Sequence, residues 1–298
     1  MTERVERWTI GSIRLTSIVE AQTAVPATLL LPDALPADVK AAGGDDPDVA
    51  ALDGSTIGFR VQAFVVESGG RTVLVDPCVG NHKSLTLPMW DHLDLPWLAD
   101  LRSAGFAPAD IDTVVHTHLH EDHIGWDTQL VQGEWTPVFG NAAHVYVGDE
   151  LDFTKQPERR EGQDPWAESI QPILDAGLSI ETAADHDLGD GFRLVATPGH
   201  TPGHASLLIE SGGAELVISG DVMDHPFQCA SPDLAHGSDW DAPMARETRK
   251  DFLDHYAERD AFVAGTHFPG SPVGRIEETA GAWKFRPVER DHIGPQPV

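Results

Sequence analysis

The feature that most constrains this chain is a run of histidines and acids, THLHEDHIG at residues 117–125, directly after a short predicted buried strand. Side chains alternate along an extended strand, which places His118 and His120 on the same side. The chain then turns, and Asp122 and His123 return toward that side. Imidazole nitrogens and a carboxylate oxygen suit Zn²⁺ at about 2.0–2.2 Å. The run therefore predicts a metal site at a strand end.

Three distant segments repeat this placement of a ligand at a strand end. In each, a predicted buried strand is followed by a histidine or an aspartate, and an aspartate buried there costs free energy unless it is paired or bound to metal. Two Pro-Gly pairs stiffen the turn that carries the first of these ligands. The three candidates are His200 after residues 192–196, Asp221 after residues 215–219 and His267 after residues 261–265.

The remaining pattern predicts two sheets with helices outside them. Hairpins are expected at 8–15, turned by Gly11, and at 60–76, turned by Gly69 and Gly70. Further strands are expected at 113–115, 143–147 and 204–210. Helices are expected at 96–104 and at 241–259, the latter with Asp241 as its N-cap. Because strands come in groups, with no regular strand–helix alternation, a strict βαβ repeat is not expected.

Residues 20–58 form the one segment of different composition. Four prolines lie there among alanine, aspartate and glycine, which predicts irregular structure because each proline lacks an amide donor. The segment is expected to act as a flap over a pocket or as a dimer arm, and a solvated surface loop is the alternative.

Length and charge exclude several classes of protein. The 298 residues are expected to form a single domain over 1–298. The net charge of −28 repels phosphate backbones and anionic lipids, so neither a nucleic-acid nor a membrane partner is expected. Two cysteines cannot make a disulfide scaffold. With no apolar run near the ~20 residues of a membrane span and no signal-peptide core, a cytoplasmic location is expected.

Taken together, the motifs resemble those of the metallo-β-lactamase superfamily. Their order along the chain is the same: H-x-H-x-D-H at 118–123, Pro-Gly-His ending at His200, Gly-Asp ending at Asp221, and a late histidine at His267. The resemblance runs from about residue 60 to about residue 269. It implies an α/β fold, a four-layer αββα sandwich with the metal site at one edge of the two β-sheets.

The resemblance also implies the role of each ligand. His118, His120 and His200 would hold one metal ion, while Asp122, His123 and His267 would hold a second. Asp221 would bridge the two ions. Two Zn²⁺ per chain are expected, although histidine and aspartate serve Mn²⁺, Fe²⁺ and Co²⁺ as well. A hydroxide between the ions would then attack the substrate, with Asp122 orienting it as the catalytic carboxylate.

The expected reaction is hydrolysis of a carboxylic ester or lactone. The repeated turn at 197–204 is similar to that of N-acyl homoserine lactonases, and the stretch 220–228 looks more like a branch that includes organophosphate hydrolases. The lactonases carry a tyrosine three residues after the bridging aspartate, where this chain has Asp224. Phosphotriester hydrolysis, glyoxalase-like thioester hydrolysis and a non-enzymatic metal-dependent sensor are the alternatives.

Five further residues are candidates for the substrate pocket or for supporting the ligands. Asp76 is expected to support a ligand loop, and His204 to contact a ligand or to be a strand-start histidine. Trp126 is expected on the pocket wall or in the core, and His225 on the pocket or in a plain loop. Asp224 is expected in the pocket. The other histidines, His236 among them, are expected to take no part.

The expected substrate is a small molecule with an apolar part. This follows if Trp126 and the 20–58 segment line the pocket. A homodimer is the further expectation, because that segment could serve as an arm toward a second copy.

Overall fold

The computed structural model describes residues 4–43, 48–156 and 165–291. Within these ranges the first sheet has seven strands in the order β1-β2-β3-β4-β5-β8-β9. They are β1 Val5–Ile10, β2 Ile13–Pro26, β3 Thr56–Ser68, β4 Arg71–Val75, β5 Thr113–Val115, β8 Ala143–Val147 and β9 Ser179–Thr182.

The second sheet also has seven strands within the described ranges, in the order β10-β11-β12-β13-β14-β15-β16. They are β10 His186–Gly189, β11 Phe192–Ala196, β12 Ala205–Ser211, β13 Ala214–Ile218, β14 Phe262–Ala264, β15 Val273–Thr279 and β16 Ala282–Pro287. A separate hairpin consists of β6 Thr128–Val131 and β7 Glu134–Pro137.

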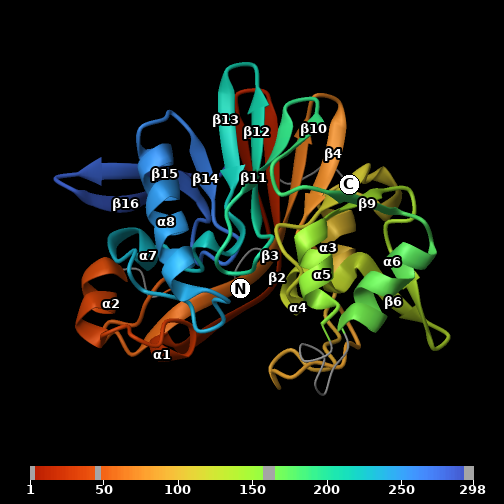
Figure 1. Cartoon of the computed structure of the whole chain (residues 1–298), viewed down its shortest axis with the longest axis horizontal. Coiled ribbons are helices and arrows are strands. Elements are labelled where there is room, and N and C mark those ends of the chain that lie inside the picture. The colour runs from red at the N-terminus through yellow and green to blue at the C-terminus, as the bar shows by residue number, and fades with distance from the viewer. Residues whose placement is uncertain (1–3, 44–47, 157–164, 292–298) are drawn as a thin grey trace.

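Helices cover the outer faces of both sheets (Figure 1). Most are short, and α8 is the longest of those described, as its 16 residues show. They are α1 Ala27–Leu30, α2 Pro36–Gly43, α3 Trp97–Ser103, α4 Glu121–Ile124, α5 Gly148–Thr154, α6 Gln171–Asp175, α7 Phe227–Ala230 and α8 Ala242–Ala257.

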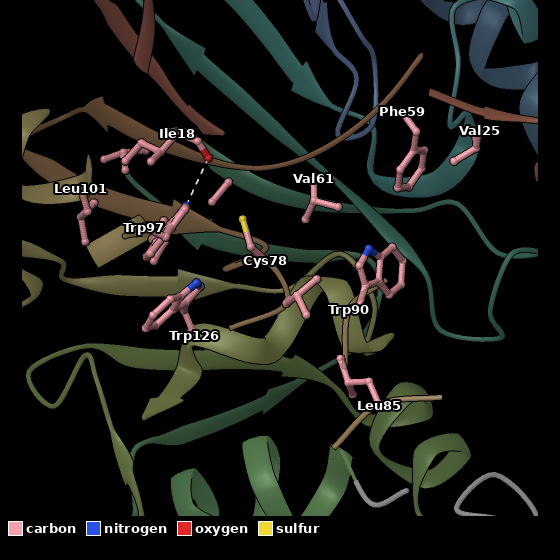
Figure 2. Packing of buried hydrophobic residues seen from close by; sticks show 14 of the residues in the cluster. Ile18, Val25, Phe59, Val61, Cys78, Leu85, Trp90, Trp97, Leu101 and Trp126 are labelled. Carbon is pink, nitrogen blue, oxygen red and sulfur yellow. Dashed lines mark hydrogen bonds between the residues drawn. The ribbon is translucent and has the colours of Figure 1, made fainter. Parts of the chain in front are cut away.

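The core lies between and around the two sheets. Val115 of the first sheet and Leu207 of the second belong to one buried apolar cluster, so the sheets pack face to face. Phe252 of α8 packs on the outer face of the second sheet. Trp97 of α3 packs on the outer face of the first, where its Nε1 donates to the Ile18 carbonyl at 3.2 Å (Figure 2). The αββα sandwich is therefore confirmed.

Parallel pairing brings the ends of four strands to one edge of the sandwich. β4 pairs parallel with β5, and β13 pairs parallel with β14, so the carboxyl ends of each pair meet. The Ala205 amide donates to the Thr117 carbonyl at 2.9 Å, which joins the two sheets at this edge. Gly220 has φ +55°, and a Cβ there would lie 2.7 Å from the Thr117 Cβ, so only glycine fits.

The expectation of irregular structure over 20–58 is wrong for most of the segment. β2 continues to Pro26 and pairs with β3, and α1 and α2 follow. Pro26 precedes α1 and Pro36 begins α2, positions where a missing amide costs nothing because the first turn of a helix has no intrahelical acceptor for it. Residues 44–47 lie outside the described residues.

The part of the chain that the structure describes contains no helix with the length and hydropathy needed to cross a membrane.

Candidate metal centre

The predicted ligands converge at the shared edge of the two sheets. His118 and His120 follow β5, and α4 carries Asp122 and His123 in its single turn. His200 lies on the turn after β11, Asp221 after β13, and His267 after β14. All of them are buried except His120, which is half-buried.

Three of these histidines face one another closely. Nδ1 of His120 lies 3.0 Å from Nε2 of His118 and 3.0 Å from Nε2 of His200. Burial lowers the pKa of each of the three well below 6.5, and the neighbouring histidines lower it further. Neutral imidazoles present lone pairs, which is the form that binds a metal ion.

A second group lies beside the first. Nε2 of His123 is 3.1 Å from Nε2 of His267. The Asp122 carboxylate is 3.6 Å from His123 and 3.5 Å from His267. Burial alone would lower the pKa of His267, but Asp221 and Asp122 outweigh it and raise that pKa to about 9. The carboxylates therefore favour positive charge at the second group.

The Asp221 carboxylate lies between the two groups. Its Oδ2 is 3.5 Å from His118 Nε2, 3.4 Å from His200 Nε2 and 3.4 Å from His123 Nε2. Its Oδ1 is 3.3 Å from His267 Nε2 and has no hydrogen-bond partner although it is buried. One carboxylate thus reaches the donor atoms of both groups.

These residues fit a pair of divalent cations. The possible ligand atoms of His118, His120, His200 and Asp221 lie within 4.8 Å of one another, and so do those of Asp122, His123 and His267. Cations between these groups explain two features of the site. One is a buried carboxylate oxygen that no donor meets, and the other is the pairs of imidazole nitrogens that face each other at about hydrogen-bond length. Imidazole and carboxylate donors suit zinc, manganese, iron and cobalt.

Partners on the far side of the rings fix their orientation. His200 Nδ1 lies 2.9 Å from Asp239 Oδ1, and His267 Nδ1 donates to the Arg60 carbonyl at 2.8 Å. His123 Nδ1 lies 3.1 Å from Asp76 Oδ2. Such contacts hold the opposite nitrogen of each ring toward the ion.

A pocket of about 540 Å³ opens onto the centre. The acids Glu121 and Asp224 and also His236 form part of its lining, together with four of the seven ligands: His120, Asp122, Asp221 and His267. The opposite walls are apolar: Val25, Leu29, Leu30, Pro32, Phe59, Leu87, Met89 and Trp90. Burial and the nearby Asp221 raise the pKa of Asp224 well above its usual 3.8.

Comparison with known proteins identifies the family. The sequence profile of the metallo-beta-lactamase superfamily matches residues 56–246. The chain belongs to the metallo-beta-lactamase superfamily. The described fold and the order of the motifs agree with this membership.

Several relatives of this chain are N-acyl homoserine lactonases. The N-acyl homoserine lactonase of Bacillus thuringiensis is 30% identical over 210 residues, 63% of this chain and 77% of that protein. The N-acyl homoserine lactonase AttM of Rhizobium radiobacter is 31% identical over 178 residues, 57% of this chain and 62% of that protein. A Bacillus sp. lactonase is 30% identical over 135 residues, so the match spans about half of its length.

Solved structures share the fold over nearly the whole chain. AbOPH, a hydrolase in the beta lactamase superfamily, superposes with a TM-score of 0.81 at 22% identity, covering 97% of this chain and 99% of its own. AidC, a dizinc quorum-quenching lactonase, superposes with a TM-score of 0.78 at 23% identity, covering 96% and 97%. At these identities the likeness establishes the metallo-beta-lactamase fold.

Three of the five supporting candidates lie at the metallo-beta-lactamase centre. Asp76 accepts from the Thr117 amide and hydroxyl at 2.8 Å each and contacts His123. His204 Nε2 accepts from the Asp221 amide at 2.9 Å, so it holds the central carboxylate from behind. Asp224 lies on the pocket lining.

Trp126 and His225 lie outside the pocket lining, so of the two places expected for each, Trp126 takes the core and His225 a loop. Trp126 packs in the core against Trp97 (Figure 2), with 5.5 Å between ring centroids. Its Nε1 donates to Glu20. His225 contacts the Val49 carbonyl at 3.0 Å and accepts from the Phe227 amide, so it braces a loop. Both side chains satisfy their polar atoms away from the substrate side.

Sequence reasoning missed residues that support the ligands from a distance. Asp239 contacts His200, and His236, expected to take no part, lines the pocket. Glu150 accepts from the amides of Leu119 at 3.2 Å and Gly203 at 2.8 Å, which ties together two loops that carry ligands. All three residues lie outside the elements predicted from the sequence, so no local pattern pointed to them.

Proposed function

We propose that this chain is a metal-dependent hydrolase that opens lactones or cleaves carboxylic esters. The observation that carries the proposal is the Asp221 carboxylate, which lies between two histidine groups on a pocket whose other walls are apolar. The named relatives at 30–31% identity are N-acyl homoserine lactonases, which supports a lactone as the substrate class.

Two zinc ions are the proposed resident metals. His118, His120 and His200 would hold one ion and Asp122, His123 and His267 the other, with Asp221 on both. When bound, such a pair lowers the pKa of a shared water toward neutrality and polarises the carbonyl of the substrate.

The chain's own residues would orient the reactants. Asp122 is the proposed catalytic carboxylate: it lies on the pocket, and its oxygens reach toward both His123 and His267. There it can accept a hydrogen bond from the attacking water and so hold it toward the carbonyl. The buried histidines remain fixed through their outer partners and need no rearrangement.

The apolar walls would take the apolar part of a small-molecule substrate. Val25 at the end of β2 and Leu29 of α1 belong to the 20–58 segment and face the pocket. We propose that this segment is the flap that covers the bound substrate within a single domain. A homodimer, a cytoplasmic location and the lack of nucleic-acid or membrane partners remain predictions from the sequence.

A substrate panel on one preparation tests this proposal. Zinc-loaded protein is offered an N-acyl homoserine lactone, an aryl ester, a phosphotriester and a glutathione thioester, and products are identified by mass spectrometry. The lactone or the ester should be hydrolysed fastest, and His118→Ala and Asp122→Asn should lose that activity. Faster turnover of the phosphotriester or thioester would contradict the proposed substrate class. Inertness toward all four would favour a metal-dependent sensor.

A further inference from the structure

Asp224 is a buried acid whose carboxylate has no hydrogen-bond partner among the described residues. Its side chain is 1% exposed, and neither carboxylate oxygen makes a hydrogen bond. A carboxylate taken out of water costs several kcal/mol unless a cation, a donor or a proton meets it. The centre described above assigns nothing to this residue.

The backbone around Asp224 is held in place. The Asp224 amide donates to Gln228 Oε1 at 2.8 Å, and the next amide, of His225, donates to the same oxygen at 3.3 Å. The His225 ring is fixed by the Val49 carbonyl and the Phe227 amide. These contacts hold the backbone from which the Asp224 side chain extends, and Asp224 forms part of the pocket lining.

The buried guanidinium of Arg249 makes its hydrogen bonds with backbone carbonyls and not with Asp224. Arg249 donates to the carbonyls of Val222, Pro232 and Leu234 and lies 3.9 Å from Asp239. No ion pair joins it to Asp224 in the part of the chain that the structure describes. The pocket side is where a cation could contact the Asp224 carboxylate directly.

The pocket side offers the second ion. The possible ligand atoms of Asp224, Asp221 and His267 all lie within 4.8 Å of one another. Two atoms bound to one ion at about 2.1 Å lie up to about 4.2 Å apart, so a small adjustment suffices. His267 has a single nitrogen to give, because its Nδ1 is held by the Arg60 carbonyl. An ion on His267 Nε2 is therefore the ion within reach of Asp224.

We propose that Asp224 is an eighth ligand of the centre and binds the ion held by His267. This inference rests on the proposed two-ion centre. The second ion would then have three carboxylates, Asp122, Asp221 and Asp224, with two imidazoles, whereas the first has one carboxylate and three imidazoles. Carboxylate-rich sites favour harder cations, so the second site gains affinity for Mn²⁺ relative to Zn²⁺.

Metal titration of the full chain tests this assignment. Metal-free wild type, Asp224→Asn and Glu121→Gln are titrated with Mn²⁺ and with Zn²⁺ by calorimetry, and bound metal is counted by elemental mass spectrometry. Glu121→Gln is the matched control, because Glu121 lines the same pocket but belongs to no ligand cluster among the described residues. Circular dichroism, and Asp224→Ala as a second variant, separate lost binding from lost folding.

The wild type should bind two ions. In Asp224→Asn the first ion should bind unchanged, while affinity for the second should fall at least about tenfold, and further for Mn²⁺ than for Zn²⁺. In a parallel titration with Co²⁺, the visible spectrum produced by the second equivalent should differ between Asp224→Asn and the wild type. Two ions bound by Asp224→Asn with wild-type affinity and spectrum would overturn the inference and leave the centre intact. A wild type that binds no second ion would overturn both.

Discussion

Asp239 Oδ1 lies 2.9 Å from Nδ1 of His200, 39 residues away along the chain. The other oxygen of Asp239 accepts from the His236 amide at 2.8 Å, so both oxygens are used. With its Nδ1 proton donated to Asp239, the His200 ring presents Nε2 to His120 and Asp221. A residue from the loop before α8 thereby orients a proposed ligand that follows β11.

Asp239→Asn should weaken metal binding. The asparagine side chain has one acceptor oxygen and no negative charge, so it cannot replace both carboxylate oxygens of Asp239. The His200 ring therefore loses its fixed orientation and some of its basicity. Affinity for the first ion should fall about 10- to 100-fold, measured by competition with a chromogenic chelator. Asp233→Asn on the same loop is the control, since Asp233 is 77% exposed and pairs with Lys250. Equal affinities in the two variants would refute the role of Asp239.

Glu150→Gln should loosen two loops at once. Glu150 accepts one amide from the loop of His118 and His120 and one from the turn of His200, and glutamine keeps a single acceptor oxygen. The unmet buried amide should cost about 1–3 kcal/mol in the free energy of unfolding, measured in urea on metal-free protein. Exposed Asp149→Asn is the neighbouring control. A variant as stable as the wild type would show that the contacts carry no energy.

Lys83 should make stability rise with pH. Burial lowers its pKa to about 7 in the folded chain, against about 10.4 when unfolded. Between these values the unfolded state binds more protons, so the free energy of unfolding increases with pH, by up to about 1.4 kcal/mol per unit. Below about pH 7 both states carry the proton and this gain is absent.

The difference between wild type and Lys83→Met isolates this effect. Relative to the variant, the wild type should gain stability from pH 7 to pH 10 in urea unfolding, and exposed Lys284→Met should run parallel to the wild type. Parallel curves for Lys83→Met and the wild type would show that the ammonium has its ordinary pKa.

The effect of Leu29→Ser on KM should depend on the length of the substrate's apolar part. Leu29 is 56% exposed and lines the pocket, whereas Leu52 is 68% exposed and lies outside its lining. KM for a long-chain acyl lactone should rise in Leu29→Ser, with kcat nearly unchanged and short-chain substrates unaffected. Leu52→Ser is the control. If chain length makes no difference to the effect, α1 does not contact the substrate.

The sequence predicted the proposed ligands that lie close together along the chain and those that follow a buried strand. His118, His120, Asp122 and His123 lie within one short run, and buried strands that end in Asp221 or His267 predict the edge where they meet. The two-sheet arrangement followed from the hairpins and the grouped strands. The N-cap of the long helix was also predicted, and Asp241 accepts from the Met244 amide at 3.0 Å.

The sequence did not predict the place of a side chain whose contacts are with residues far away along the chain. Trp126 comes directly after the run at residues 117–125, but its indole donates to Glu20 on β2 and lies in the core. His225 lies close to Asp221 along the chain, yet its ring contacts the Val49 carbonyl. The prolines of residues 20–58 predicted irregular chain because the positions of Pro26 before α1 and of Pro36 at the start of α2 show only once these helices are located.

Anomalous diffraction from zinc-soaked crystals tests the central claim most directly. Two peaks are expected, one among His118, His120 and His200 and one between His123 and His267, with the Asp221 carboxylate in contact with both. A single peak that Asp221 does not touch, or no peak among these residues at saturating zinc, would contradict the two-ion centre.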